Sequence, residues 1–159
     1  MKLIVDFDDA LMKQSAERGR NPLFMLYWMQ GQQVYPEQKW VDSGSVVLSW
    51  WLFSARALLE GAAEADFSFM EGPFSLTVRR LGNQVTITDA EQTWNTKVVL
   101  QGFIAELLTA TNQVLRKFAE LGIDDRNGLQ AGMRQLQTAL SKTNIDSSSR
   151  PLVVASVSH

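Results

Sequence analysis

The chain has 159 residues, of which 45% are hydrophobic and 20% are charged, and its formal net charge is -2. It contains no cysteine, and its one histidine is the last residue, His159, so disulfides and thiolate metal sites are excluded and histidine catalysis is disfavoured. The near balance of acidic and basic residues gives no electrostatic footprint for nucleic acid or an anionic membrane.

Targeting and membrane signals are not expected. The N-terminal apolar run, Leu3 to Val5, stops at Asp6 and is much shorter than a signal peptide requires. The most hydrophobic segment, residues 46–59, contains serines and an arginine and falls short of the roughly 20 apolar residues that span a bilayer. We therefore expect a cytoplasmic protein with no membrane segment.

The first elements in chain order are strands. Residues 2–7 predict a short strand that ends in an acidic group, and residues 12–21 are polar enough for a loop or a short helix. Residues 23–29, LFMLYWM, are apolar without a break and rich in aromatics, which favours a strand buried on both faces. Val34 and Tyr35 are expected to form a returning strand.

A central helix follows. Asp42 and Ser43 offer N-cap side chains, and Gly61 offers a natural end. Between them, apolar residues nearly encircle the helix, which predicts that it is central to the fold. One of its apolar rows consists of Val46, Trp50, Phe53 and Ala57.

A hairpin is predicted around Gly82. In the sequence Leu81-Gly82-Asn83-Gln84, glycine occupies the first central position of a two-residue loop, as a type II′ turn requires. The register of this hairpin then gives four cross-strand pairs: Val78 with Ile87, Arg80 with Val85, Thr77 with Thr88, and Arg79 with Thr86. The first two pairs form a largely apolar face and the other two a wholly polar one, so the sheet has one packed and one wet side.

Helices complete the predicted fold. Residues 93–99, including Trp94, predict a last strand, and residues 100–121 carry a long amphipathic stripe closed by Gly122. A further helix begins near Leu129, with Asp124, Asp125 or Asn127 as its cap. We predict an α+β fold in which residues 1–145 form a single domain, an antiparallel β-meander packed against two to three helices. Residues 146–159 are a Ser-rich tail, expected to be flexible or to pair with a sheet edge.

One motif suggests an enzyme. Residues 3–11, LIVDFDDAL, resemble the first motif of haloacid-dehalogenase-like phosphatases, and this implies Asp6 as nucleophile and Asp8 as general acid beside magnesium. However, Ala10 stands where that family has threonine, and a hairpin meander replaces the parallel βαβ units. Neither a Gly-x-Ser-x-Gly elbow nor a phosphate-binding glycine loop occurs. We therefore expect no catalytic residue, metal or cofactor, and keep the phosphatase as an alternative.

The wet sheet face is the candidate binding surface. Thr77, Arg79, Thr86 and Thr88 form a hydroxyl-rich surface that can meet a protein partner. Trp94 is a candidate anchor, since tryptophan is enriched in interface hot spots.

Three segments in this order resemble small bacterial toxin immunity proteins: Trp40-Val41-Asp42, Val47-Leu48-Ser49-Trp50-Trp51, and Phe69-Met70-Glu71-Gly72-Pro73-Phe74. The resemblance implies a cytoplasmic, non-enzymatic protein that binds one cognate toxin tightly. The balanced charge argues against mimicry of nucleic acid as the inhibitory mode. A structural or homo-oligomeric subunit is the remaining alternative.

Overall fold

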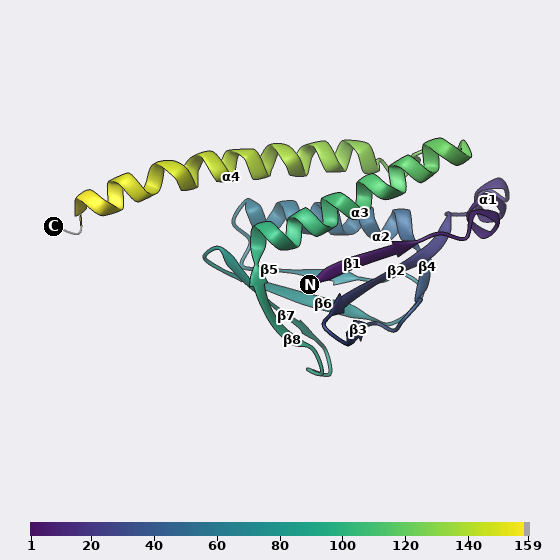
Figure 1. Ribbon diagram of the computed structural model, residues 1–159, viewed down its shortest axis with the longest axis horizontal. Coiled ribbons are helices and arrows are strands. Elements are labelled where there is room, and N and C mark those ends of the chain that lie inside the picture. The colour runs from purple at the N-terminus through teal and green to yellow at the C-terminus, as the bar shows by residue number, and fades with distance from the viewer. Residues whose placement is uncertain (158–159) are drawn as a thin grey trace.

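The computed structural model describes residues 1–157, with side chains through residue 143, and within that range it contains four helices and two four-stranded antiparallel sheets (Figure 1). The predicted α+β class is confirmed. The strands, however, form two sheets where the sequence suggested one meander.

The first sheet is built around β2 (Leu23–Gln30). β1 (Lys2–Asp6) pairs along one edge of it, and β3 (Gln33–Tyr35) and β4 (Val41–Ser43) lie end to end along the other. A short helix, α1 (Asp9–Glu17), connects β1 to β2. The apolar run is confirmed as a strand with buried side chains on both faces, because the adjacent residues Tyr27 and Trp28 are both buried.

The second sheet is a meander in chain order. Its strands are β5 (Glu64–Ser68), β6 (Ser75–Leu81), β7 (Gln84–Asp89) and β8 (Asn95–Val99). The four predicted cross-strand pairs between β6 and β7 are all confirmed. Gly82 has φ +65°, the left-handed conformation that the turn demands and that glycine adopts without strain.

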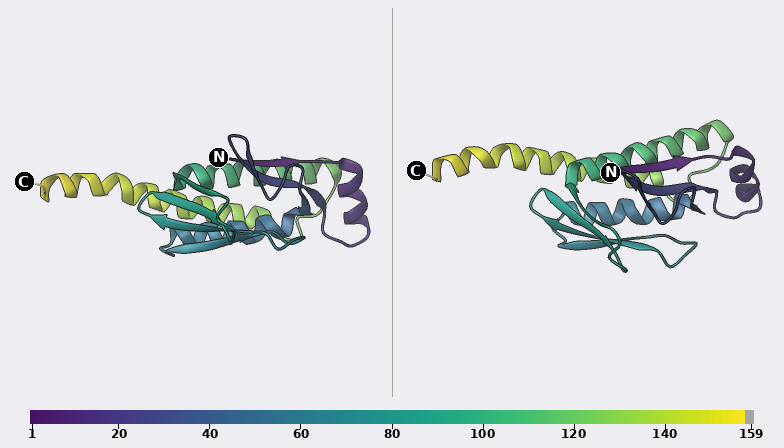
Figure 2. Two further views of the ribbon diagram at one scale, coloured as in Figure 1. Left: turned by 90° about the horizontal axis from the view of Figure 1, so that it is seen from below. Right: turned by 60° about the horizontal axis from the view of Figure 1, so that its bottom comes forward.

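Helices α2 (Gly44–Leu59), α3 (Leu100–Leu121) and α4 (Leu129–Val157) lie on one side of the second sheet, as Figure 2 shows from below. α3 has the predicted bounds and ends at Gly122, whose φ is +68°. Asp125 caps α4, since its carboxylate accepts the backbone N–H groups of Leu129 and Gln130 at 2.8 and 2.9 Å. The other two cap candidates do not make these bonds.

Both sheets meet in one aromatic core. Trp28 of β2 stacks on Trp51 of α2 and on Phe103 of α3, with ring centroids 5.6 and 5.1 Å apart. Phe67 of β5 packs edge-on against Phe103 at 5.2 Å. Four elements from both halves of the chain therefore share the same buried cluster.

The prediction for α2 needs two corrections. Asp42 belongs to β4, and Ser43, at the N-cap position, makes no side-chain cap bond. The helix is also buried on one side only: Trp51 is fully buried, whereas Trp50 is 44% and Phe53 73% exposed. The apolar row that includes Trp50 and Phe53 therefore faces away from the core.

The C-terminal segment differs from the predicted tail. α4 continues through residue 157, past the boundary at 145, and its later turns extend beyond the sheets (Figure 1). Serine has only a moderately lower helix propensity than alanine, so a Ser-rich composition does not by itself end a helix, although Pro151 removes one backbone donor. Residues 158–159 of the expected tail lie outside the described residues.

None of the helices in the described part of the chain combines the length and the apolar character needed to cross a membrane.

Candidate functional site

The candidate site is the outward face of the second sheet, called here the open face. Because side chains alternate along a strand, the register places one set on the side of the sheet away from the buried residues Phe67, Leu76 and Val78. The open face consists of Glu64, Asp66, Ser68, Ser75, Thr77, Arg79, Leu81, Gln84, Thr86, Thr88, Asn95, Lys97 and Val99. The predicted residues Thr77, Arg79, Thr86 and Thr88 are thus brought together on one surface.

The half of the open face formed by β5 and β6 is already paired within the chain. Arg79 Nη2 lies 3.1 Å from Glu64 Oε2, and the Thr77 hydroxyl donates to Asp66 Oδ1 at 3.1 Å. These groups satisfy one another, and exposed ion pairs of this kind contribute little to stability.

The half formed by β7 and β8 is chemically open. Thr86 faces Lys97 and Thr88 faces Asn95, and the side chains of these four residues make no hydrogen bond or ion pair to the described side chains. At the hairpin end the face becomes apolar, since Leu81 is 82% and Val99 47% exposed. This half offers unpaired hydroxyls, an amide and an ammonium, beside the exposed aliphatic groups of Val99 in β8 and of Leu81 at the adjoining end of β6.

Trp94 does not belong to this surface. It precedes β8, is buried, and packs against Tyr35 with ring centroids 6.0 Å apart. Its backbone N–H donates to Asp89 Oδ1 at 2.9 Å. The prediction of Trp94 as a binding anchor is therefore wrong, and the residue is part of the core.

Sequence reasoning missed the apolar surface residues. Trp50 and Phe53 were expected to be buried in the central helix, yet both are exposed on α2. The signal was present, because Ser49, Ser54 and Arg56 lie on the same side of the helix as Trp50 and Phe53 and so mark that side as the wet one. The opposite side, which carries Trp51, packs on the neighbouring elements.

A buried carboxylate joins the two sheets. Asp42 is fully buried, and its oxygens accept from Trp40 Nε1 at 2.9 Å and from the backbone N–H groups of Met70 and Glu71 at 3.2 and 3.3 Å. The Trp40 and Phe74 rings pack edge-on at 5.2 Å, next to the turn at Gly72. Two of the segments that carried the resemblance are therefore in direct contact, and their role here is structural.

Two ionisable groups near the edge of the core have shifted pKa values. Burial alone would raise the pKa of the Asp89 carboxyl, but hydrogen bonds from the Thr93 hydroxyl and the Trp94 backbone N–H hold this pKa below its ordinary value. Burial raises the pKa of the Tyr35 phenol, which exchanges hydrogen bonds with the backbone of Ser75. Both groups are hydrogen-bonded to neighbouring parts of the chain.

The N-terminal aspartates have local structural partners. Asp8 caps α1 by accepting the Leu11 N–H at 3.1 Å, and Asp9 forms an ion pair with Lys117 at 3.1 Å. This pairing raises the pKa of the Lys117 ammonium. Asp6 accepts the Phe7 N–H at 2.9 Å, and the strand it ends belongs to an antiparallel sheet, whereas the phosphatase architecture is parallel.

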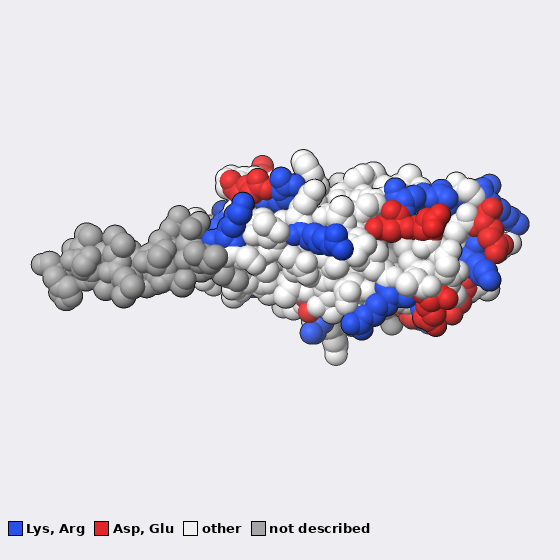
Figure 3. All heavy atoms as spheres, turned by 90° about the horizontal axis from the view of Figure 1, so that it is seen from above, with Lys and Arg blue, Asp and Glu red and all other residues white. Residues whose placement is uncertain are grey.

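Metal-binding geometry is not found in the described residues: no three histidine, cysteine, aspartate or glutamate side chains gather closely enough to hold an ion. On the face seen from above, basic and acidic side chains are intermixed (Figure 3).

Comparison with protein-family models, curated proteins and solved structures gave no match to this chain.

Proposed function

We propose that this protein is a non-enzymatic binding module, an immunity protein that neutralises a cognate bacterial toxin by occluding it in the cytoplasm. The observation that carries the proposal is the β7–β8 half of the open face. It combines unpaired polar groups with the exposed Val99, it adjoins the exposed Leu81 at the end of β6, and it lies on the side of the sheet away from the helices.

This surface suits a protein partner better than a small molecule. It is a sheet face with hydroxyl, amide and ammonium groups spread along two strands, whereas small-molecule sites are concave and largely apolar. A stable protein interface buries at least about 1,200 Å² in total, which requires a surface of several strands and their flanking turns. Because the paired strands are already rigid, little conformational entropy is lost when this surface binds a partner.

The direct test uses the gene adjacent to the one that encodes this chain. The C-terminal domain of its product is expressed alone and together with this protein, and growth and co-purification are measured. The proposal predicts that the domain is toxic alone, that co-expression restores growth, and that the two proteins purify as a complex. A toxic domain that is neither rescued nor bound would sink the proposal.

The binding surface is tested with matched threonine variants. Thr86→Arg adds a long cation to the middle of the open face and is expected to weaken the complex at least about tenfold. Thr109→Arg makes the same change on the exposed side of α3 and is expected to bind like the wild type. Equal loss in both variants, or in neither, would place the toxin on another surface.

A further inference from the structure

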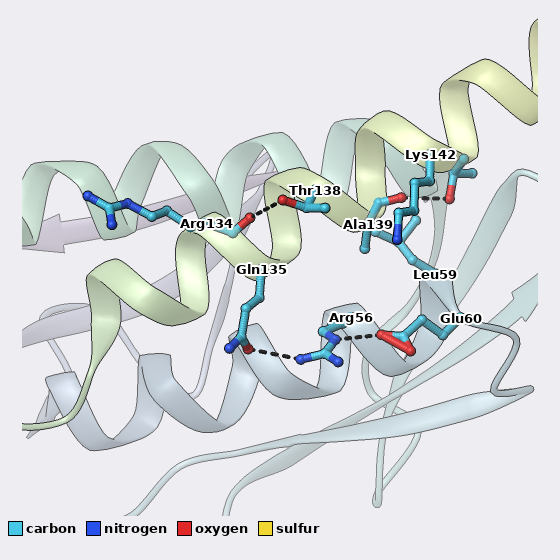
Figure 4. A pocket seen from close by; sticks show the side chains of 9 residues that line it. Arg56, Leu59, Glu60, Arg134, Gln135, Thr138, Ala139 and Lys142 are labelled. Carbon is cyan, nitrogen blue, oxygen red and sulfur yellow. Dashed lines mark hydrogen bonds and ion pairs between the residues drawn. The ribbon is translucent and has the colours of Figure 1, made fainter.

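A groove runs along the seam between α2 and α4, away from the open face. Its first part, about 200 Å³, lies beside Phe53 and the small residues Gly128 and Ala131. Its second part, about 540 Å³, lies between the end of α2 and residues 134–143 of α4 (Figure 4). Arg56 and Gln135 line both parts, and Arg56 Nη1 donates to Gln135 Oε1 at 2.9 Å across the seam. The two parts therefore adjoin each other at this bridge.

The first part of the groove is bordered by the exposed aromatic side chain of Phe53. Phe53 is 73% exposed, and Trp50, three residues earlier and on the same side of α2, is 44% exposed. Large aromatic groups left in water on a rigid helix are characteristic of interaction sites. Close packing holds the helix in place, because a Cβ added at Gly132 would lie 3.2 Å from Leu52 Cδ1.

The second part of the groove is cationic. Arg56 is held by Glu60 and Gln135, whereas Arg134 and Lys142 have no carboxylate partner among the described side chains. Arg134 lies along α4 at one end of this part, and Lys142 extends from α4 toward the end of α2 (Figure 4). Among the described side chains that line this part, Glu60 is the one carboxylate and Arg56, Arg134 and Lys142 are the cations, with Arg134 extending away from the other two (Figure 4). Arg134 and Lys142 are therefore the groups that can receive negative charge.

We propose that this groove binds an acidic segment of a partner protein, with an apolar side chain against Phe53 and carboxylates near Arg134 and Lys142. The arrangement is directional, because the apolar and the cationic parts of the groove lie at different levels along α2. Phe53 borders the first part, and Glu60, seven residues later and about 10 Å along the helix axis, borders the second. Such spacing matches an apolar anchor followed along the chain by acidic residues. An anionic membrane is a poorer match, because the site is concave and carries fewer cations than the four to eight of a typical polybasic patch.

The probe is a short fluorescein-labelled peptide with a phenylalanine and leucine anchor near one end, followed about seven residues later by a run of glutamates. Its twin has lysine in place of every glutamate. Fluorescence anisotropy measures binding of both peptides to the full chain, and vesicles of phosphatidylglycerol with phosphatidylcholine supply the membrane arm. We expect the acidic peptide to bind at least about tenfold more tightly than its twin, and added salt to weaken this binding.

Four variants locate the binding. The double variant Arg134→Glu with Lys142→Glu and the single variant Phe53→Ser are each expected to weaken binding of the acidic peptide about tenfold or more. The double variant Arg116→Glu with Lys97→Glu, on α3 and β8, and the single variant Leu81→Ser on the open face make the same kinds of change outside the groove and are expected to bind normally. All of these side chains are exposed, so circular dichroism is expected to show an unchanged fold.

Several results would overturn the proposal. These are equal binding of the two peptides, no binding of either, or wild-type affinity in the groove variants. If the wild-type protein binds the anionic vesicles tightly and the groove variants do not, the surface would be assigned to a membrane. The open-face variant Thr86→Arg is expected to keep its affinity for the peptide. The groove proposal can therefore hold even if the toxin experiment fails.

Discussion

At the scale of single residues, Asp42 has the most demanding environment. It is fully buried, and a buried charge is costly unless hydrogen bonds replace its lost hydration. Its carboxylate accepts from one indole and three backbone N–H groups, those of Ser43, Met70 and Glu71. Charge-assisted bonds of this kind fix the turn after β5 against β4.

Replacing Asp42 with asparagine removes the charge while keeping the size. The amide has one acceptor oxygen and places an NH₂ donor against groups that are themselves donors. We expect the Asp42→Asn variant to lose about 2–3 kcal/mol of unfolding free energy, measured by urea titration. Asp124→Asn, at an exposed position, is the control and is expected to change it by less than about 0.5 kcal/mol. Similar values for the two variants would contradict a structural role for Asp42.

Asp89 makes the free energy of unfolding depend on pH in the acidic range. Because its folded pKa lies below the ordinary value of 3.8, the ionised carboxylate stabilises the fold above that value, and the contribution is lost as pH falls through the folded pKa. Thr93→Val removes one donor and is expected to cost about 1 kcal/mol at neutral pH. The difference from wild type should shrink as pH falls below 3.8. Urea titrations across this range test it, and a pH-independent difference would contradict the assignment.

At the scale of elements, local rules predicted some structures completely. The β6–β7 register follows from Gly82 in the turn and from the alternation of apolar residues, both of which act within one hairpin. Likewise the polar residues Thr77, Thr86 and Thr88 were placed on the wet face by period alone. The bounds of α3 were predicted correctly, because its amphipathic stripe of apolar residues stops where Gly122 ends the helix.

Elements whose position depends on distant contacts were predicted less well. α2 was predicted to be apolar nearly all round, and the prediction did not use the polar residues Ser49, Ser54 and Arg56, which share the side of Trp50 and Phe53. Trp51 is the buried one because it packs against Trp28 and Phe69, which are distant in sequence. Trp94 was misplaced for the same reason, since Tyr35 covers it from the first sheet.

The adjacent tryptophans of α2 give a direct test of this packing. Trp51→Ala is expected to cost about 3–5 kcal/mol, because it leaves a large cavity in the aromatic core. Trp50→Ala removes a partly exposed ring and is expected to cost less than about 1 kcal/mol. Urea titration of both variants measures the difference. Comparable losses would mean that the two rows of α2 are equally buried.

At the scale of the whole molecule, the two sheets are joined by polar ties as well as by the aromatic core. Asp42 in β4 holds the turn after β5, and the Tyr35 hydroxyl of β3 donates to the Ser75 carbonyl of β6 at 3.1 Å. The same hydroxyl accepts the Ser75 N–H at 2.9 Å. Neither sheet has a separate core, because the Trp28 and Phe67 rings both pack against Phe103.

This shared core predicts that the two sheets unfold together. A sheet that loses its partner would expose half of the aromatic cluster, so partial unfolding is costly. We expect the slowest-exchanging amides of β2 and of β6 to report opening free energies within about 1 kcal/mol of each other by native-state hydrogen exchange. Asp42→Asn is expected to lower the opening free energies of β2 and β6 by the same amount, because it weakens the contact between the two sheets and not the pairing within one of them. A variant in which β6 keeps its protection while β2 loses it would show that the second sheet is stable without the first.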